Sequence, residues 1–166
     1  MRPFFSFSLL IWLFTLGFAF HLPAQTQIQP SAFLTFPDEQ LRVFNAGSDI
    51  PNQLVTGPND MLIDIFRRNF IQNFFPFDWR IEVSRIDTEW HPDLRLEVRR
   101  NGNGQGFYRI PTGGEVYQTI APTPSLLMEG VGYRVDIPLQ FRISGCSVTL
   151  PAKTYQTTIL LTLIEP

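Results

Sequence analysis

Four side chains that commonly bind metal ions lie two residues apart in one short segment. They are Asp87, Glu89, His91 and Asp93. Because single residues separate them, an extended backbone would place all four on one face, where calcium or zinc could bind. The alternative is a solvated connection between two strands. Pro92 favours that connection, since proline interrupts a regular ladder. We therefore expect a connection here and keep the four side chains as metal candidates.

The only cysteine of the chain, Cys146, could form a nucleophile pair with His91. Such a pair needs a thiolate, which a helix N-terminus or a neighbouring cation usually stabilises. Cys146 instead follows Gly145 in a strand-like sequence, so we expect a small, buried, apolar side chain. With one cysteine, no disulfide can form within the chain. The Gly-x-Ser-x-Gly motif of many serine hydrolases does not occur either. We expect no enzymatic activity and no cofactor.

Two further features could belong to a binding surface. Gly102, Gly104 and Gly106 recur at every second position, which is not the spacing of a dinucleotide-binding loop. We expect a flexible hairpin tip there. Trp90 could stack on a sugar ring, or it could cover one end of the fold.

The first 24 residues have the layout of a secretory signal peptide. Arg2 supplies a positive charge, residues 4–20 carry none, and Ala24 precedes polar sequence. An uncleaved membrane anchor is the alternative, but the apolar run is shorter than the roughly 20 residues that a spanning helix needs. We expect cleavage after Ala24, with Ala19 as the second choice, and no membrane span in the mature protein. The protein would then be periplasmic, on the cell surface or extracellular.

The charge of the chain excludes some partners. It has 13 basic and 15 acidic residues and a formal net charge of −2. Binding to bulk nucleic acid or to anionic lipid needs a basic face, which this balance does not predict. We expect no nucleic-acid partner.

Several segments alternate apolar and polar residues with a period of two, as half-buried strands do. Turn signals separate them, which favours an antiparallel sandwich over alternating strands and helices. The expected strands are 40–44, 53–56, 61–66, 79–83, 94–98, 107–110, 116–120, 133–143 and 155–164. Apolar residues at i, i+4 spacing, ended by Pro76, predict a short helical turn at 68–74. The chain is thus expected to be all-β, an antiparallel immunoglobulin-like β-sandwich formed by one domain, residues 25–166.

Two of these strands lead to specific expectations. In 133–143 the residues expected to be buried are Ile137, Leu139 and Phe141, and those expected to be exposed are Asp136 and Gln140. Pro138 cannot donate to a ladder and indicates an edge strand or a bulge. Segment 155–164 is apolar on both faces, which is typical of a central strand.

Residues 147–159 read Ser-Val-Thr-Leu-Pro-Ala-Lys-Thr-Tyr-Gln-Thr-Thr-Ile, and alternating Leu161 and Leu163 follow. This sequence resembles the C-terminal strand of bacterial pilin-like and spore-coat-U-like secreted domains. In those domains a Pro-Ala-Gly-Thr-Tyr turn leads into a last strand rich in Thr and Val. The resemblance implies an immunoglobulin-like sandwich that assembles or adheres at the cell surface, without catalysis.

The segment after the leader also alternates. Its apolar residues at even positions are Ile28, Pro30, Ala32, Leu34 and Phe36. Residues 25–36 could complete a neighbour's sheet as a donor strand, or form the first strand of their own sandwich, which we favour. We expect an exported, non-enzymatic structural or adhesive protein, in the manner of a pilin subunit, that joins copies of itself or another surface protein by strand addition. The alternative is an extracellular module that binds carbohydrate or another surface ligand.

Overall fold

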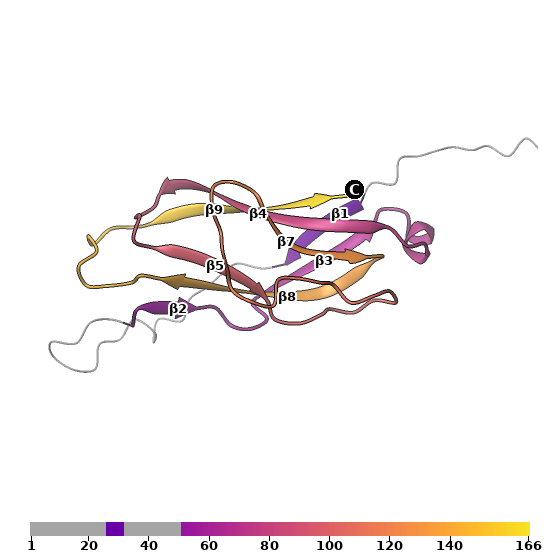
Figure 1. The fold of residues 1–166 in the computed structure, drawn as a ribbon, viewed down its shortest axis with the longest axis horizontal. Helices are drawn as coiled ribbons and strands as arrows, with labels where there is room; N and C mark the ends of the chain where they lie inside the picture. The colour runs from indigo at the N-terminus through magenta and orange to yellow at the C-terminus, as the bar shows by residue number, and fades with distance from the viewer. Residues whose placement is uncertain (1–25, 32–50) are drawn as a thin grey trace, which may run out of the picture.

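The computed structural model describes residues 26–31 and 51–166 (Figure 1). The predicted signal peptide, its cleavage site and the predicted strand 40–44 lie outside these residues. Within them the chain forms nine strands and one short 3-10 helix, η3 (Phe70–Phe74). The strands are β1 (Thr26–Ser31), β2 (Gln53–Val55), β3 (Met61–Arg67), β4 (Asp78–Glu89), β5 (Arg95–Arg100), β6 (Gln118–Thr119), β7 (Ser125–Val131), β8 (Arg134–Ser144) and β9 (Gln156–Ile164).

The strands form two antiparallel sheets. One has the order β1-β3-β8-β5-β6, with β2 also paired to β8, and the other has the order β7-β4-β9. Figure 1 shows β4 and β9 lying over β5 and β8. This arrangement confirms the all-β antiparallel sandwich, and η3 lies within the predicted helical turn.

The core lies between the sheets and takes side chains from both. Ile137, Leu139 and Phe141 of β8 are fully buried, as their alternation predicted. They meet Trp79 and Ile81 of β4, which are also buried. Because side chains alternate across a strand, each of these sequences gives its apolar row to the same interior.

The prediction that Gln140 is exposed is wrong, since only 7% of its surface is accessible. The amide Nε2 of Gln140 donates to the carbonyl of Thr56 at 2.9 Å. Its Oε1 accepts two hydrogen bonds from Arg99, at 3.0 and 2.7 Å. Gln140 therefore lies under neighbouring strands rather than in solvent. Asp136 is exposed as predicted.

Of the two predictions for Pro138, an edge strand or a bulge, the edge is wrong and the bulge agrees with the structure, while the predicted central position of β9 is wrong. β8 is central, with β3 and β2 along one side and β5 along the other, so Pro138 does not mark an edge. Pro138 lies opposite Leu62, next to a register shift in β3 between Ile63 and Ile65. Strand β9, predicted to be central, lies at the edge of the smaller sheet.

The region between β5 and β8 differs most from the prediction. Residues 107–110 form no strand, and only Gln118–Thr119 of 116–120 is one. β7 was missed because a register shift opposite Ile81 puts two consecutive residues, Leu127 and Met128, into the core. A bulge of this kind removes the period-two signal.

The glycines of this region also have another role than predicted. Residue 105 pairs with Val135, so the segment lies along β8 instead of forming a projecting flexible tip. A Cβ on Gly104 would stand 2.5 Å from the carbonyl oxygen of Val135, and one on Gly106 equally close to that of Tyr133. These glycines permit close approach of two backbones.

Candidate functional site

Asp87 and Glu89, the first two metal candidates, lie at the end of β4 and bind other side chains. Asp87 accepts a hydrogen bond of 2.8 Å from the hydroxyl of Thr157 and lies 3.4 Å from Arg85. Glu89 accepts one of 2.8 Å from the ammonium of Lys153. Both carboxylates are exposed and paired with neighbours on or beside β9.

The structure brings only His91 and Asp93 of the four candidates together. The Nδ1 of His91 accepts the backbone N–H of Asp93 at 3.3 Å, inside the β4–β5 connection. Across residues 26–31 and 51–166, no three His, Cys, Asp or Glu side chains are placed to hold a metal ion. The alternation of Asp87 to Asp93 is thus the end of a strand followed by a turn.

Trp90 covers one end of the sandwich. It is half-buried against the core, and its indole N–H donates to the carbonyl of Leu94 at 2.9 Å. The guanidinium of Arg85 lies over its ring, 5.2 Å from the centroid. Next to it in sequence, His91 meets the ring of Tyr155 edge-on at 6.0 Å. With its N–H bonded and one ring face covered, Trp90 is not presented as a platform for a sugar.

Cys146 is buried at the start of the β8–β9 connection, where its backbone N–H donates to the carbonyl of Asn52 at 3.3 Å. Burial raises the pKa of its thiol, because a thiolate would lose its hydration. A nucleophilic cysteine needs the opposite shift. This placement agrees with the interpretation of Cys146 as a small core residue.

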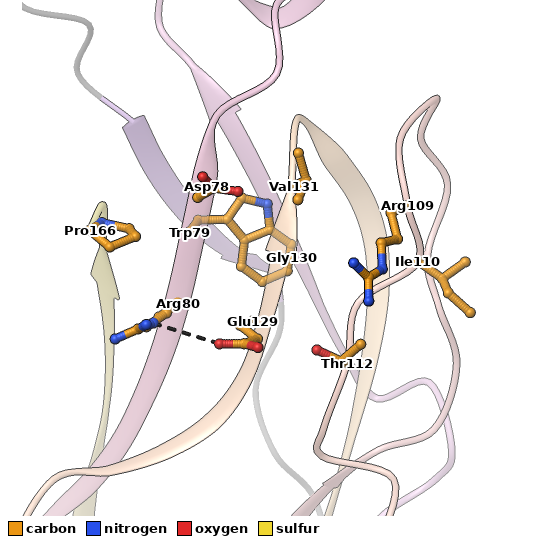
Figure 2. A pocket seen from close by; sticks show the side chains of 10 residues that line it. All are labelled: Asp78, Trp79, Arg80, Arg109, Ile110, Thr112, Glu129, Gly130, Val131 and Pro166. Carbon is orange, nitrogen blue, oxygen red and sulfur yellow. Dashed lines mark ion pairs between the residues drawn. The ribbon is translucent and has the colours of Figure 1, made fainter.

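An open pocket of about 300 Å³ lies where β4 begins, beside β7 and the 109–112 loop (Figure 2). Its charged groups are Asp78, Arg80, Arg109 and Glu129. Arg80 and Glu129 form an ion pair of 3.6 Å across it. The indole N–H of Trp79 is used inside the fold, on the carbonyl of Gly132. Small-molecule sites are typically enclosed and mostly apolar, and this pocket is open and lined by charged groups.

The β9 edge has the features of a protein-binding site. In the part of the chain that the structure describes, β9 pairs with β4 on one side and with no strand on the other. Its sequence, QTTILLTLI, contains no charge, no proline and no glycine. Ile159, Leu161 and Leu163 pack on the core, while Leu160 is 39% exposed on the opposite face.

The other edge of the same sheet, at β7, is closed. Thr112 and Glu129 exchange backbone hydrogen bonds of 2.9 and 3.0 Å. Further along, the side-chain amide of Gln118 donates to the hydroxyl of Ser125 at 2.8 Å and to the carbonyl of Leu126 at 3.0 Å. Among the described residues, the smaller sheet is therefore covered at its β7 edge, whereas its β9 edge pairs with no further strand and is approached by β1.

No helix among residues 26–31 and 51–166 is long and apolar enough to cross a membrane. Comparison of the chain with family models, with curated proteins and with solved structures found no match.

Proposed function

We propose that this protein is an exported, non-enzymatic structural or adhesive subunit that associates by strand addition at β9, with a second copy or with another surface protein. The observation that carries the proposal is the β9 edge, which pairs with no further strand among residues 26–31 and 51–166, although β1 approaches it. Natural edge strands are usually short, or carry Lys, Pro, a bulge or a covering loop. β9 has nine residues, none of these residue types, and no register shift in its central part.

An added strand would gain main-chain hydrogen bonds along this edge and side-chain contacts on both faces. The β-branched and leucine residues of β9 favour an extended backbone, which an added strand can pair with. Side chains of the added strand would lie beside Leu160 on the outer face, where it now meets solvent. Both sources of affinity come from β9 itself, and no catalytic group takes part.

The N-terminal strand has its own place in the fold. β1 pairs with β3 over its whole length, from Thr26 opposite Arg67 to Ser31 opposite Leu62. The side chain of Ile28 packs against the core. Residues 26–31 thus pair within their own sheet, residues 25 and 32–36 of the predicted strand lie outside the described residues, and the proposal makes β9 the edge of assembly.

The pilin-like and immunoglobulin-like relationship belongs to the same proposal. The quoted resemblance ends in β9, and a turn ordered by the hydroxyl of Tyr155 on the carbonyl of Pro151, at 2.7 Å, leads into that strand. In pilin-like domains the sheet edges are the places where subunits meet, which supports an assembly role for β9.

The experiment is the oligomeric state of the mature protein, measured by analytical ultracentrifugation over a wide concentration range. The wild type should self-associate, or bind its surface partner. Leu160→Lys combined with Thr162→Lys places like charges on adjoining strands and should abolish association. The melting temperature should stay nearly unchanged, because both side chains reach solvent.

The matched control is Leu126→Lys on β7, in the same sheet and on its closed edge. It adds a charge at a similarly exposed leucine and should leave association intact. A wild type that stays monomeric at high concentration and binds no surface protein would overturn the proposal. So would equal loss of association in the β9 variant and in Leu126→Lys.

The carbohydrate-binding alternative has less support. It would use the aromatic residues at the end of the sandwich, but Trp90 is bonded to Leu94 and covered by Arg85. Tyr117, on the larger sheet, is likewise covered by Arg142, 4.0 Å from the centroid. A glycan array with the wild type and Trp90→Ala would decide this alternative: binding lost in Trp90→Ala, with the fold intact, would favour it.

A further inference from the structure

A group of large apolar side chains stands exposed around η3. Phe70, Ile71, Phe74 and Phe75, which we call the aromatic tip, have 74%, 65%, 56% and 60% of their surface accessible. Figure 1 shows this segment as a coil at one end of the long axis, between β3 and β4. Apolar residues that gather at a projecting end of a soluble fold usually mark an interaction surface.

Two asparagine side chains of the same segment form hydrogen bonds with its own backbone. Asn69 caps η3, its Oδ1 accepting from the backbone N–H of Ile71 at 3.1 Å. The side chain of Asn73 bonds both backbone groups of Arg67, at 2.6 and 3.0 Å. Each backbone group that is bonded in this way costs less to move into an apolar phase.

The aromatic tip is also held in shape. The rings of Phe70 and Phe74 meet edge to face, with centroids 5.1 Å apart. The hydroxyl of Tyr108 donates to the carbonyl of Phe74 at 2.6 Å and ties the neighbouring loop to η3. That loop adds two more exposed apolar side chains, Phe107 and Ile110. The apolar surface is therefore formed before any partner binds.

Arginines lie close to the aromatic tip in sequence. Segment 65–77 has two arginines and no acidic residue, and Asp64 and Asp78 flank it. Arg67 is committed to Glu165 and to the ring of Phe77. Arg68 is exposed directly before η3, and Arg109, also exposed, follows Tyr108 in the adjoining loop. Arg109 projects beside the pocket whose other arginine is paired with Glu129 (Figure 2).

We propose that the aromatic tip inserts into the surface of a phospholipid bilayer, with Arg68 and Arg109 on the headgroup phosphates, and that it prefers anionic lipid. Aromatic side chains with arginines beside them match the acyl boundary and the phosphate layer, in that order. A projecting, preformed apolar surface suits a fluid apolar layer, which needs no matching cavity. The net charge of the whole chain does not oppose this, because salt screens distant charges within about 10 Å.

Vesicle binding tests the proposal, with phosphatidylcholine vesicles compared with vesicles that also contain phosphatidylglycerol. The mature protein should bind the anionic vesicles more tightly. Phe70→Ser with Phe74→Ser should weaken binding to both by about tenfold or more, since two buried rings are lost. Arg68→Gln and Arg109→Gln should each weaken binding to the anionic vesicles by about fivefold and bring the two affinities together. In Phe74→Trp, tryptophan emission should shift to the blue on binding and be quenched by brominated acyl chains.

The matched control is Ile86→Ser, at the other end of β4. Ile86 is 56% exposed, like Phe74, and its loss should not change vesicle binding. The β9 variant Leu160→Lys with Thr162→Lys should also bind vesicles normally, which separates this inference from the proposed assembly. A wild type that does not bind anionic vesicles overturns the inference. Equal vesicle binding by the wild type and by Phe70→Ser with Phe74→Ser overturns it too. If the wild type binds no vesicles and this tip variant loses self-association, the aromatic tip contacts protein and the inference is also overturned.

Discussion

Arg100, the last residue of β5, offers the sharpest test of how the long β5–β6 connection is held. Its side chain is buried, and each of its five N–H donors has an acceptor in that connection. The acceptors are the carbonyls of Gly102, Pro111 and Gly113 and the side chains of Asn103 and Glu115. One guanidinium thus replaces the strand pairing that residues 101–117 mostly lack.

Arg100→Met keeps most of the buried volume but leaves three carbonyls without a donor. An unpaired buried carbonyl costs about 1–3 kcal/mol, and water will reach part of this connection, so we expect a total loss of about 3–5 kcal/mol. Glu115 is mostly exposed, so its pairing should contribute less than about 1 kcal/mol of that total. Arg100→Lys retains the charge but has fewer donors, so its free energy of unfolding should lie between those of the wild type and Arg100→Met.

Equilibrium unfolding in urea, followed by the fluorescence of buried Trp79, measures these free energies. The control is Arg80→Met, which removes a half-exposed arginine and its surface ion pair to Glu129. That change should cost less than about 1 kcal/mol. A loss in Arg100→Met no larger than in Arg80→Met would show that water replaces the guanidinium, and the reasoning would fail.

The remaining predictions concern the core, acid stability and the thiol. Phe141→Ala should cost about 3–5 kcal/mol in urea unfolding, as truncation of a buried Phe does. Gln140→Ala should cost about 1–3 kcal/mol because it leaves a buried carbonyl unpaired, and a loss near zero would contradict its burial. Hydrogen bonds of 2.8 Å from Arg142 lower the pKa of Glu97, so its stabilisation is complete above its ordinary pKa and is lost as pH falls through the lowered value. Unfolding measured from neutral to acid pH should therefore lose stability on the acid side, and Glu97→Gln should reduce that loss. Cys146 should react slowly with a thiol reagent until the protein unfolds, and rapid labelling of the native protein would contradict its burial.

The fold could be predicted where one face of a strand meets the core and the other meets water. β8, β4 and β5 follow that rule, and Ile137, Leu139 and Phe141 are buried as their period of two requires. The rule fails where polar side chains and loops also cover the outer face of a strand. The alternation predicts that Gln140 faces solvent, but Arg99 and Thr56, which are distant in sequence, bond its side chain. The residue type alone does not indicate such partners.

The candidate site was harder to predict because spacing does not determine pairing. Asp87 and Glu89 have the spacing of metal ligands, yet their carboxylates bind other side chains. Asp87 pairs with Arg85 and Thr157, and Glu89 pairs with Lys153. Two of these partners belong to the segment that leads into or forms β9, which is remote in sequence. The β9 edge and the aromatic tip, which carry our proposals, have no distinctive sequence pattern. Only the structure shows that β9 has no second paired strand among the described residues and that the side chains of the tip are exposed.

The edge position of β9, whose sequence predicts a central strand, supports the assembly proposal. A central strand needs apolar residues on both faces only where both faces are covered, and β9 has them although it lies at an edge. β8 tolerates Pro138 at the centre because a register shift in β3 lies beside it and the carbonyl of Pro138 still accepts the N–H of Asn101 at 2.9 Å. The pairing of β9 shifts register only at its start, opposite Asp87 and Glu89, and Leu160 in its central part remains exposed. Apolar residues on both faces of β9 indicate a strand whose faces are both shielded, and an added strand would place side chains beside Leu160 on the outer face. A strand added by a partner would also give β9 the central place that its sequence predicts.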